Sequence, residues 1–234
     1  MTHMPKREKF VPGCLYHIYN RAVEKRSIFL DNSDYLRAIH NLFEFNNETP
    51  ATNSGYLFNT IGFGNQYTTQ RKPLVDILVF CLMPNHFHLL LKPRREGGLE
   101  LFMRKFGAGY ANYFNLKYKR SGALFEGRYK SILIEKESHL IHLPFYIHLN
   151  PLDLSFPSWR TGHLKNHQQA MSYLESYRWS SYLDYIGKHN FPSVTQRNYL
   201  MEFFNGPANY KQEMESWLKS QSAETMKDVL IEHY

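Results

Sequence analysis

The 234-residue chain has little cysteine and no long apolar segment. Its two cysteines, Cys14 and Cys81, are far apart, and no Cys-x-x-Cys pair occurs. A disulfide framework is therefore excluded and a reducing compartment is expected. No apolar run approaches the roughly 18 residues that span a bilayer, and the polar, basic residues 1–9 precede no apolar signal core. We expect a cytoplasmic protein that does not enter a membrane.

Aromatic residues and positive charge are abundant by contrast. The chain holds 17 Tyr, 17 Phe and 3 Trp, 43% of its residues are hydrophobic, and its formal charge is +7. This length and composition fit one good-sized folded domain, or a domain with a substantial appendage. The charge favours a polyanionic partner, although a solvated basic surface explains it equally well.

The most informative stretch is a hairpin within residues 73–93. Two apolar runs, 74–83 and 87–91, flank the turn signal Pro84-Asn85, which predicts two buried strands. His86 and His88 are two residues apart on the second strand, so both imidazoles project from one face. Such a pair is half of a possible metal site, or simply a structural pair.

The flanking segments predict the rest of the fold. Apolar and aromatic residues 14–20 indicate a first strand, and helical spacing indicates a helix from Asp31 or Asn32 to about Glu44. A helix over about 99–118, a strand at 131–135 and a helix over about 138–149 follow the hairpin. Strand, helix, strand, strand, helix, strand is the order of an α+β, ferredoxin-like antiparallel sheet. A candidate catalytic helix follows its last strand.

Two regions depart from this pattern. Residues 46–72 are rich in Asn, Thr, Gly and Ser and predict an insertion loop or flap. Residues after Pro151 contain turns and aromatics, and 194–234 are expected to be helical. We therefore predict a catalytic domain over 10–151 and, over 152–234, a wrapping segment with a helical C-terminal extension.

The helix over 138–149 carries the second set of candidate site residues. Tyr146 and Asn150 are four residues apart and share a face. In the expected fold this helix can bring them towards His86 and His88, giving two imidazoles, an amide oxygen and a phenol. Such a site suits Mg²⁺ or Mn²⁺ with open positions for a phosphodiester, which the phenol could attack.

Basic residues are concentrated between Leu101 and Lys136. Eight Lys or Arg stand there against two Glu, interleaved with aromatic residues. Basic residues bind phosphates and aromatics stack on unpaired bases, so the pattern favours single-stranded nucleic acid. The candidate DNA-binding residues, with two from the end of the first strand, are Asn20, Arg21, Arg104, Lys105, Lys119, Arg120, Arg128 and Lys130.

Taken together, these motifs resemble the HUH single-tyrosine transposases, and among them the REP-associated tyrosine transposases. The resemblance covers about residues 10–187 and is carried by five motifs: Tyr16-His-Ile with Asn20-Arg21, Cys81-Leu-Met-Pro-Asn-His-Phe-His-Leu-Leu-Leu, Gly122-x-Leu-Phe-Glu-Gly-Arg-Tyr-Lys-Ser, Tyr146-Ile-His-Leu-Asn-Pro and Trp179-Ser-Ser-Tyr.

This resemblance implies the roles of the site residues. Tyr146 would be the nucleophile, His86 and His88 the metal ligands, and Asn150 the third, polar ligand. It also implies cleavage of single-stranded DNA next to a REP-like or transposon-end hairpin, through a 5′-phosphotyrosine and a free 3′-OH. The 46–72 insertion and the residues after 187 depart from the shorter insertion-sequence enzymes, so a homodimer stays an open alternative.

The sequence thus predicts a metal-dependent transposase that cleaves and rejoins single-stranded DNA. Two alternatives stay open. A relaxase-like or replication-initiator-like nickase would use the same residues without transposition. A non-catalytic single-stranded nucleic-acid-binding module would use the sheet alone, since ferredoxin-like sheets often serve that purpose.

Overall fold

The computed structural model describes residues 9–50 and 71–220. The predicted order of strands and helices is confirmed. The elements of the sheet domain are β1 Leu15–Arg21, α1 Asn32–Glu44, β2 Val75–Met83, β3 His86–Pro93, α2 Gly98–Lys117, β4 Lys130–Ile134 and α3 Glu137–Leu149. The 3-10 segments η2 Asn150–Leu154 and η3 Pro157–Thr161 follow, and then α4 His167–Ser176, α5 Tyr182–Tyr185, α6 Asn198–Phe203 and α7 Pro207–Ser220.

The four strands form one antiparallel sheet in the order β2-β3-β1-β4. This is the ferredoxin-like arrangement that the sequence predicts. The turn between Met83 and His86 joins β2 to β3, and β1 lies between β3 and β4. The two central strands are therefore β3 and β1, and they carry the histidines discussed below.

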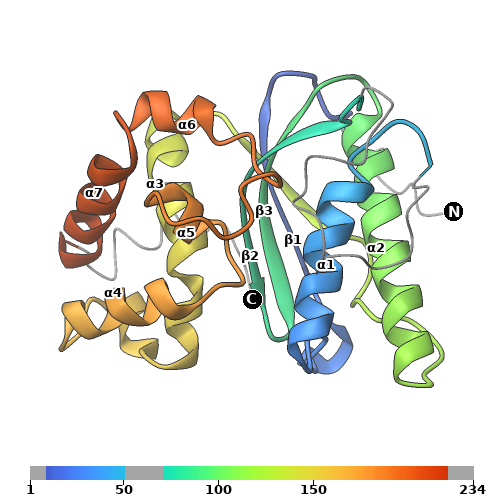
Figure 1. Cartoon of the computed structure of the whole chain (residues 1–234), viewed down its shortest axis with the longest axis horizontal. Helices are drawn as coiled ribbons and strands as arrows, with labels where there is room; N and C mark the ends of the chain where they lie inside the picture. The colour runs from blue at the N-terminus through green and yellow to red at the C-terminus, as the bar shows by residue number, and fades with distance from the viewer. Residues whose placement is uncertain (1–8, 51–70, 221–234) are drawn as a thin grey trace, which may run out of the picture.

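Helices cover both faces of the sheet (Figure 1). α1 and α2 lie on one face, and α3 with the later helices lies on the other. β3 sends Phe87, Leu89 and Leu91 into the core beneath α1 and α2, and Leu90 into the core beneath α3. Because side chains alternate along a strand, His86 and His88 must lie on the α3 face.

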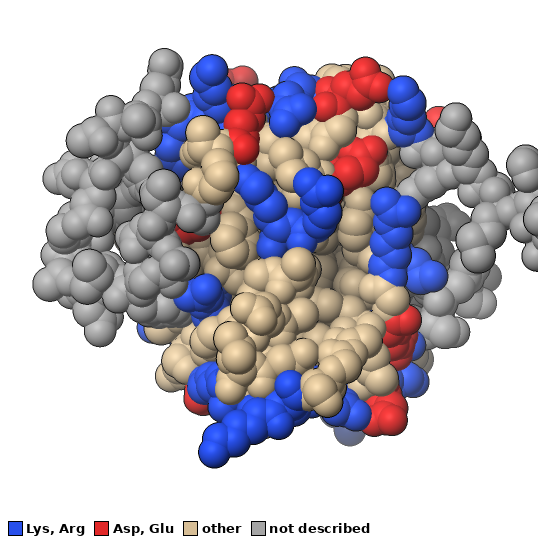
Figure 2. Space-filling model, turned by 90° about the vertical axis from the view of Figure 1, so that its right-hand side faces the viewer, with Lys and Arg blue, Asp and Glu red and all other residues tan. Residues whose placement is uncertain are grey.

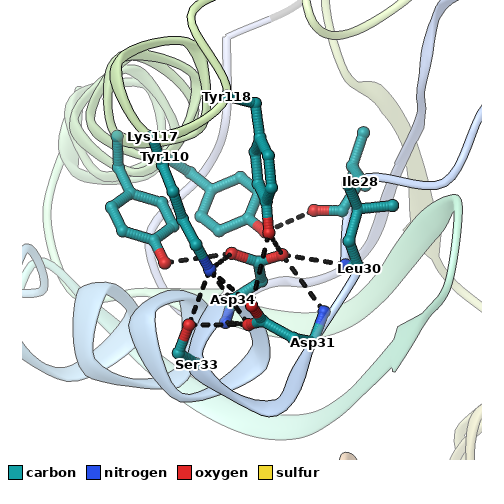
Figure 3. Close-up of polar contacts among 9 residues, drawn as sticks. Ile28, Leu30, Asp31, Ser33, Asp34, Tyr110, Lys117 and Tyr118 are labelled. Carbon is teal, nitrogen blue, oxygen red and sulfur yellow. Dashed lines mark hydrogen bonds and ion pairs between the residues drawn. The ribbon is translucent and has the colours of Figure 1, made fainter.

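A polar network joins the start of α1 to the end of α2 (Figure 3). Asp31 caps α1 in a capping box with Asp34. Lys117 pairs with both carboxylates, at 2.8 Å from Asp31 and 2.7 Å from Asp34. The hydroxyls of Tyr113 and Tyr118 also donate to Asp34, whose side chain is fully buried. This network fixes the two helices against each other.

Two glycines in α2 have different surroundings. A Cβ added to Gly109 would lie 2.3 Å from the ring of Phe45, whereas one added to Gly107 would meet nothing within 4 Å. Gly109 therefore allows the close approach of the loop after α1, and Gly107 leaves space on the surface of α2.

Residues 177–196 line the outer edge of β2. Leu82 N donates to Trp179 O and Ser181 N donates to Phe80 O, at 2.9 and 3.0 Å. Side chains complete the edge, because the hydroxyls of Tyr177 and Tyr185 donate to the carbonyls of Leu82 and Leu78 and the Gln196 amide accepts from Ile77 N. The part of the chain after α3 is thereby joined to the sheet.

The structure does not test every prediction made from the sequence. Most of the predicted 46–72 insertion, residues 51–70, and the last residues, 221–234, lie outside the described part of the chain. The division into a domain over 10–151 and an extension over 152–234 stays a prediction. Within 9–50 and 71–220, none of the helices combines the length and the apolar character needed to cross a membrane.

Candidate active site

Two imidazoles project together from the α3 face of β3. The ring centroids of His86 and His88 are 4.9 Å apart, with the rings nearly perpendicular. His88 is completely buried and His86 is partly exposed. His86 Nδ1 lies 2.6 Å from the side-chain oxygen of Asn85 in the turn. The pair thus sits at the end of the hairpin, open to solvent on one side.

A third imidazole comes from the neighbouring strand. His17 on β1 pairs in register with Leu90, so its side chain falls on the same face as His88. His17 Nε2 lies 3.1 Å from His88 Nδ1, and His17 is buried. His17 is not among the site residues predicted from the sequence, because its contact with His88 depends on the register between two strands about 70 residues apart.

α3 brings Tyr146 against these histidines. The Tyr146 ring centroid lies 6.1 Å from that of His88 and 6.4 Å from that of His17, with edge-to-face geometry in both cases. Tyr146 is completely buried. The expected approach of this helix to the hairpin is therefore observed, and it places the phenol beside two imidazoles.

Asn150 lies one turn after Tyr146 at the end of α3. Its Nδ2 donates to the Tyr146 carbonyl at 2.9 Å, and its Oδ1 accepts from Arg160 Nη2 at 2.8 Å. Both ends of the amide are therefore hydrogen-bonded within the chain. The predicted role of Asn150 as a metal ligand stays a prediction, and it requires Oδ1 to exchange Arg160 for the ion.

Arg160 enters the site from η3. Its Nη1 donates to the Tyr146 hydroxyl at 3.2 Å, and its guanidinium carbon lies 5.2 Å from the centre of the Tyr146 ring. Asp153 holds the guanidinium through contacts of 2.8 Å to Nε and 2.6 Å to Nη2. Burial lowers the pKa of Arg160, but the Asp153 hydrogen bond and the Tyr146 interaction outweigh it and the net pKa is raised. Arg160 is therefore a permanent cation at this phenol.

The residues present suit a metal with open coordination positions. Among residues 9–50 and 71–220, no three His, Cys, Asp or Glu side chains gather as a ready metal site. The candidate donors are instead the imidazoles of His86 and His88 and the amide oxygen of Asn150. The Nδ1 atoms of both histidines have polar neighbours, Asn85 and His17, as is typical of metal-binding imidazoles that coordinate through Nε2.

A groove opens on the opposite face of the sheet. Its volume is about 560 Å³, and its walls come from the end of β1, from α2 and from the loop before β4: Asn20, Phe87, Gly97, Glu100, Leu101, Met103, Arg104, Gly107, Ala108, Phe125, Gly127, Arg128 and Tyr129. We call it the α2 groove. Three of the predicted DNA-binding residues, Asn20, Arg104 and Arg128, line it together with aromatic rings.

The other predicted DNA-binding residues are distributed differently. Arg21 pairs with Glu126 at 3.0 Å, and its register with His86 places it on the active-site face. Lys105 donates to the carbonyls of Asn47 and Thr49, at 2.5 and 2.9 Å, and burial lowers its pKa. Lys105 thus holds the loop after α1, and its predicted DNA contact has to compete with these bonds.

Three basic residues lie beyond the groove. Lys119 and Arg120 follow the end of α2 at Lys117, which lies about 14 Å along the helix from Ala108 at 1.5 Å per residue, and Arg120 donates to Asn115. Lys130 is exposed at the start of β4. Figure 2 shows lysine and arginine spread over the face on which α1 and α2 lie, with acidic residues among them. The predicted set is therefore a broad surface and not a single patch.

Comparisons with known proteins concern the family and the fold. Residues 66–150 match a family model described as "Transposase IS200 like". A solved structure of a REP-associated tyrosine transposase bound to a REP hairpin superposes with a TM-score of 0.52 at 14% identity, covering 82% of this chain and 90% of that one, so the two share a fold. No curated protein matches significantly. Residues 66–150 are therefore similar to IS200-like transposases, in line with the resemblance to HUH single-tyrosine transposases that the sequence motifs carry.

Proposed function

We propose that this protein is a transposase that acts as a metal-dependent single-tyrosine DNA strand transferase, with Tyr146 as its nucleophile. The observation that carries the proposal is the packing of the Tyr146 ring against His88 and His17, 6.1 and 6.4 Å away. Tyr146 lies 58 positions after His88 and 129 after His17 in the chain, yet the three side chains meet at one point of the sheet. A phenol beside paired imidazoles supplies a nucleophile and a phosphate-activating metal site together.

A divalent ion, Mg²⁺ or Mn²⁺, would be held by His86, His88 and Asn150. When bound, it partly neutralises the phosphodiester and makes its phosphorus more electrophilic. The chain's own residues do the remaining work. His17 and Asn85 orient the two imidazoles through their Nδ1 atoms, and α3 fixes the direction of Tyr146.

In the reaction, a phosphoryl group of the DNA is transferred to Tyr146 and later from Tyr146 to a 3′-OH. Tyr146 Oη forms a bond to phosphorus and loses its proton to solvent, while the bond to the 3′ oxygen breaks and that oxygen gains a proton. The products are a 5′-phosphotyrosine and a free 3′-OH. The covalent link conserves the phosphodiester energy, so a second 3′-OH can rejoin the strand without another energy source.

The proposed substrate is single-stranded DNA next to a REP-like or transposon-end hairpin. The fold is shared with a REP-associated tyrosine transposase bound to a REP hairpin. The α2 groove combines Arg104 and Arg128 with the rings of Phe125 and Tyr129, the combination that binds phosphates and stacks on unpaired bases. Asn20 and Arg21 link the groove to the active-site face, because adjacent residues of a strand point to opposite faces.

The experiment is a covalent trapping assay. A labelled single strand carrying a hairpin and its flanks is incubated with the protein and Mg²⁺, and products are separated under denaturing conditions. We expect a protein–DNA adduct that chelator and Tyr146→Phe each abolish. The matched control is Tyr199→Phe, which removes the hydroxyl of an exposed tyrosine on α6 and is expected to leave the adduct yield unchanged.

The other outcomes identify the alternatives. Undiminished adduct in Tyr146→Phe removes this tyrosine from the nucleophile role. Adduct without rejoining, when a second strand with a free 3′-OH is supplied, favours the relaxase-like or replication-initiator-like nickase. Tight binding of hairpins with no adduct on any of them favours the non-catalytic binding module.

A further inference from the structure

Arg160 contacts the proposed nucleophile yet belongs to none of the motifs that carry the family resemblance. It lies on η3, 14 residues after Tyr146, and its Nη1 donates to the phenol oxygen at 3.2 Å. Nη2 donates to Asn150 Oδ1 at 2.8 Å. One guanidinium therefore reaches the attacking atom and a candidate metal ligand at once.

The position of this guanidinium is fixed by a carboxylate. Asp153 accepts from Nε at 2.8 Å and from Nη2 at 2.6 Å, and Trp159 Nε1 donates to the same carboxylate at 2.7 Å. The Arg160 side chain is about one fifth exposed. Planar Arg–carboxylate pairs of this kind restrict the rotation of the guanidinium, so its remaining edge is aimed at Tyr146.

A phosphate attacked by Tyr146 has to come within reach of Arg160. Reacting atoms approach to about 3–3.5 Å before attack, and Nη1 is 3.2 Å from the attacking oxygen. When the phosphate approaches on the Arg160 side of the phenol oxygen, its non-bridging oxygens, about 1.5 Å from phosphorus, come within hydrogen-bonding range of the same N–H groups. A phosphate anion is also a stronger acceptor for guanidinium than a neutral phenol or amide.

We propose that Arg160 is a catalytic residue that binds the scissile phosphate and stabilises the charge that develops on its oxygens during attack. Without DNA, the same guanidinium holds the Tyr146 hydroxyl and Asn150 Oδ1. Arrival of the phosphate exchanges these neutral acceptors for anionic ones and releases the Tyr146 oxygen for attack. Asp153 is the positioning residue. This inference rests on the proposed function, with Tyr146 as nucleophile.

Two substitutions separate the contribution of the charge of Arg160 to the rate from that of its guanidinium geometry. Loss of one preorganised donor at a reacting oxygen lowers rates about 10²- to 10³-fold, so we expect Arg160→Ala to slow adduct formation by that factor. Arg160→Lys keeps the charge but not the two-pronged geometry, and we expect it to recover part of the rate. Lys165→Ala, which removes an exposed cation from the same segment, is expected to change nothing.

A chemical substitution in the DNA distinguishes phosphate binding from a structural role. The cleavage position is first mapped with wild-type protein, and the scissile phosphate of that strand is then replaced by an uncharged methylphosphonate. Binding of both strands is measured in chelator, so that no metal ion contacts the phosphate, in a Tyr146→Phe background with Arg160 intact or replaced by Lys or Ala. We expect the methylphosphonate to weaken binding about tenfold or more with Arg160 intact and less than about twofold in Arg160→Ala.

The outcomes distinguish failure of the Arg160 inference from failure of the proposed function. Equal weakening by methylphosphonate with Arg160 intact and in Arg160→Ala overturns the inference, as does a wild-type adduct rate in Arg160→Ala, and the proposed function survives both. If Arg160→Ala does not fold, the Arg160→Lys protein gives the same comparison, and a full methylphosphonate effect there with unchanged rate overturns the inference. If wild-type protein forms no adduct, the proposed function fails and the inference fails with it.

Discussion

A buried histidine two residues after Tyr146 on α3 is expected to make the stability of this protein depend on pH. His148 lies two residues after Tyr146, but its side chain points into the core beneath α3. Its Nδ1 lies 2.6 Å from the Tyr210 hydroxyl on α7, and its Nε2 lies 2.7 Å from Ser181 Oγ. His148 thus joins α3 to α7 and to the segment that lines β2. Its complete burial lowers its pKa to about 3.

The sign and size of the effect follow from this pKa. In the unfolded chain the imidazole takes up a proton near its ordinary pKa of about 6.5, whereas in the folded chain it stays neutral until about pH 3. The unfolded state therefore binds more protons below pH 6.5, and the free energy of unfolding falls as pH falls from 6.5 towards 3. At pH 5 the loss is about 1.5 pH units at about 1.4 kcal/mol each, or about 2 kcal/mol.

The assay is urea unfolding of wild-type protein and His148→Gln at pH 8 and pH 5, in chelator. Glutamine removes the titration, so we expect the wild type to lose about 2 kcal/mol more than the variant over this interval. At pH 8 the variant is expected to be less stable by about 1–3 kcal/mol, because Tyr210 and Ser181 lose good partners.

The comparison of variants isolates His148 from other groups. His40, whose pKa burial and Arg37 lower to about 4, contributes a pH dependence of the same sign in both proteins. His189→Gln, at an exposed position, is the matched control and should behave as wild type. If the pH dependence of His148→Gln coincides with that of wild type within about 0.5 kcal/mol, the reasoning is refuted.

Three further predictions concern other parts of the molecule. His17→Asn should weaken Mn²⁺ binding about 10- to 100-fold, measured by calorimetry, because His88, a proposed ligand, loses the partner that orients it; unchanged affinity would exclude this orienting role of His17. Gly107→Ala should stabilise the protein by about 0.5–1 kcal/mol, whereas Gly109→Ala should be net destabilising by about 1 kcal/mol because its Cβ meets an aromatic ring; equal thermal shifts would contradict this. Lys117→Met should cost about 2–4 kcal/mol in urea unfolding by leaving buried Asp34 without its cation, and a loss below about 1 kcal/mol would mean that the tyrosine hydroxyls suffice.

The fold was predictable because its signals are local. The Pro84-Asn85 turn and the apolar runs around it define the hairpin, and Asp31 caps α1 as its position suggests. Alternation along β3 also places His86 and His88 on one face without further information. These features depend on neighbours in the sequence, which propensity and periodicity describe well.

The rest of the site was not predictable from spacing, because its contacts are long-range. His17 reaches His88 only through the register of β1 on β3. Arg160 reaches Tyr146 only because the chain reverses through η2 and η3, in a segment with no periodic pattern. The hydrogen bond from Arg160 to Asn150 Oδ1 is likewise a tertiary contact. A sequence motif gives only the order of residues and cannot predict it.

The lining of β2 has a consequence for assembly. An end strand normally offers a row of unpaired backbone groups to which another chain can add. Here Ile77, Leu78, Phe80 and Leu82 already bond residues 177–196 of the same chain. A second copy cannot continue the sheet at this edge while that segment stays in place. A dimer built by joining two sheets would have to use β4, so the residues after α3 leave one edge of the sheet, not two, for the addition of a second copy.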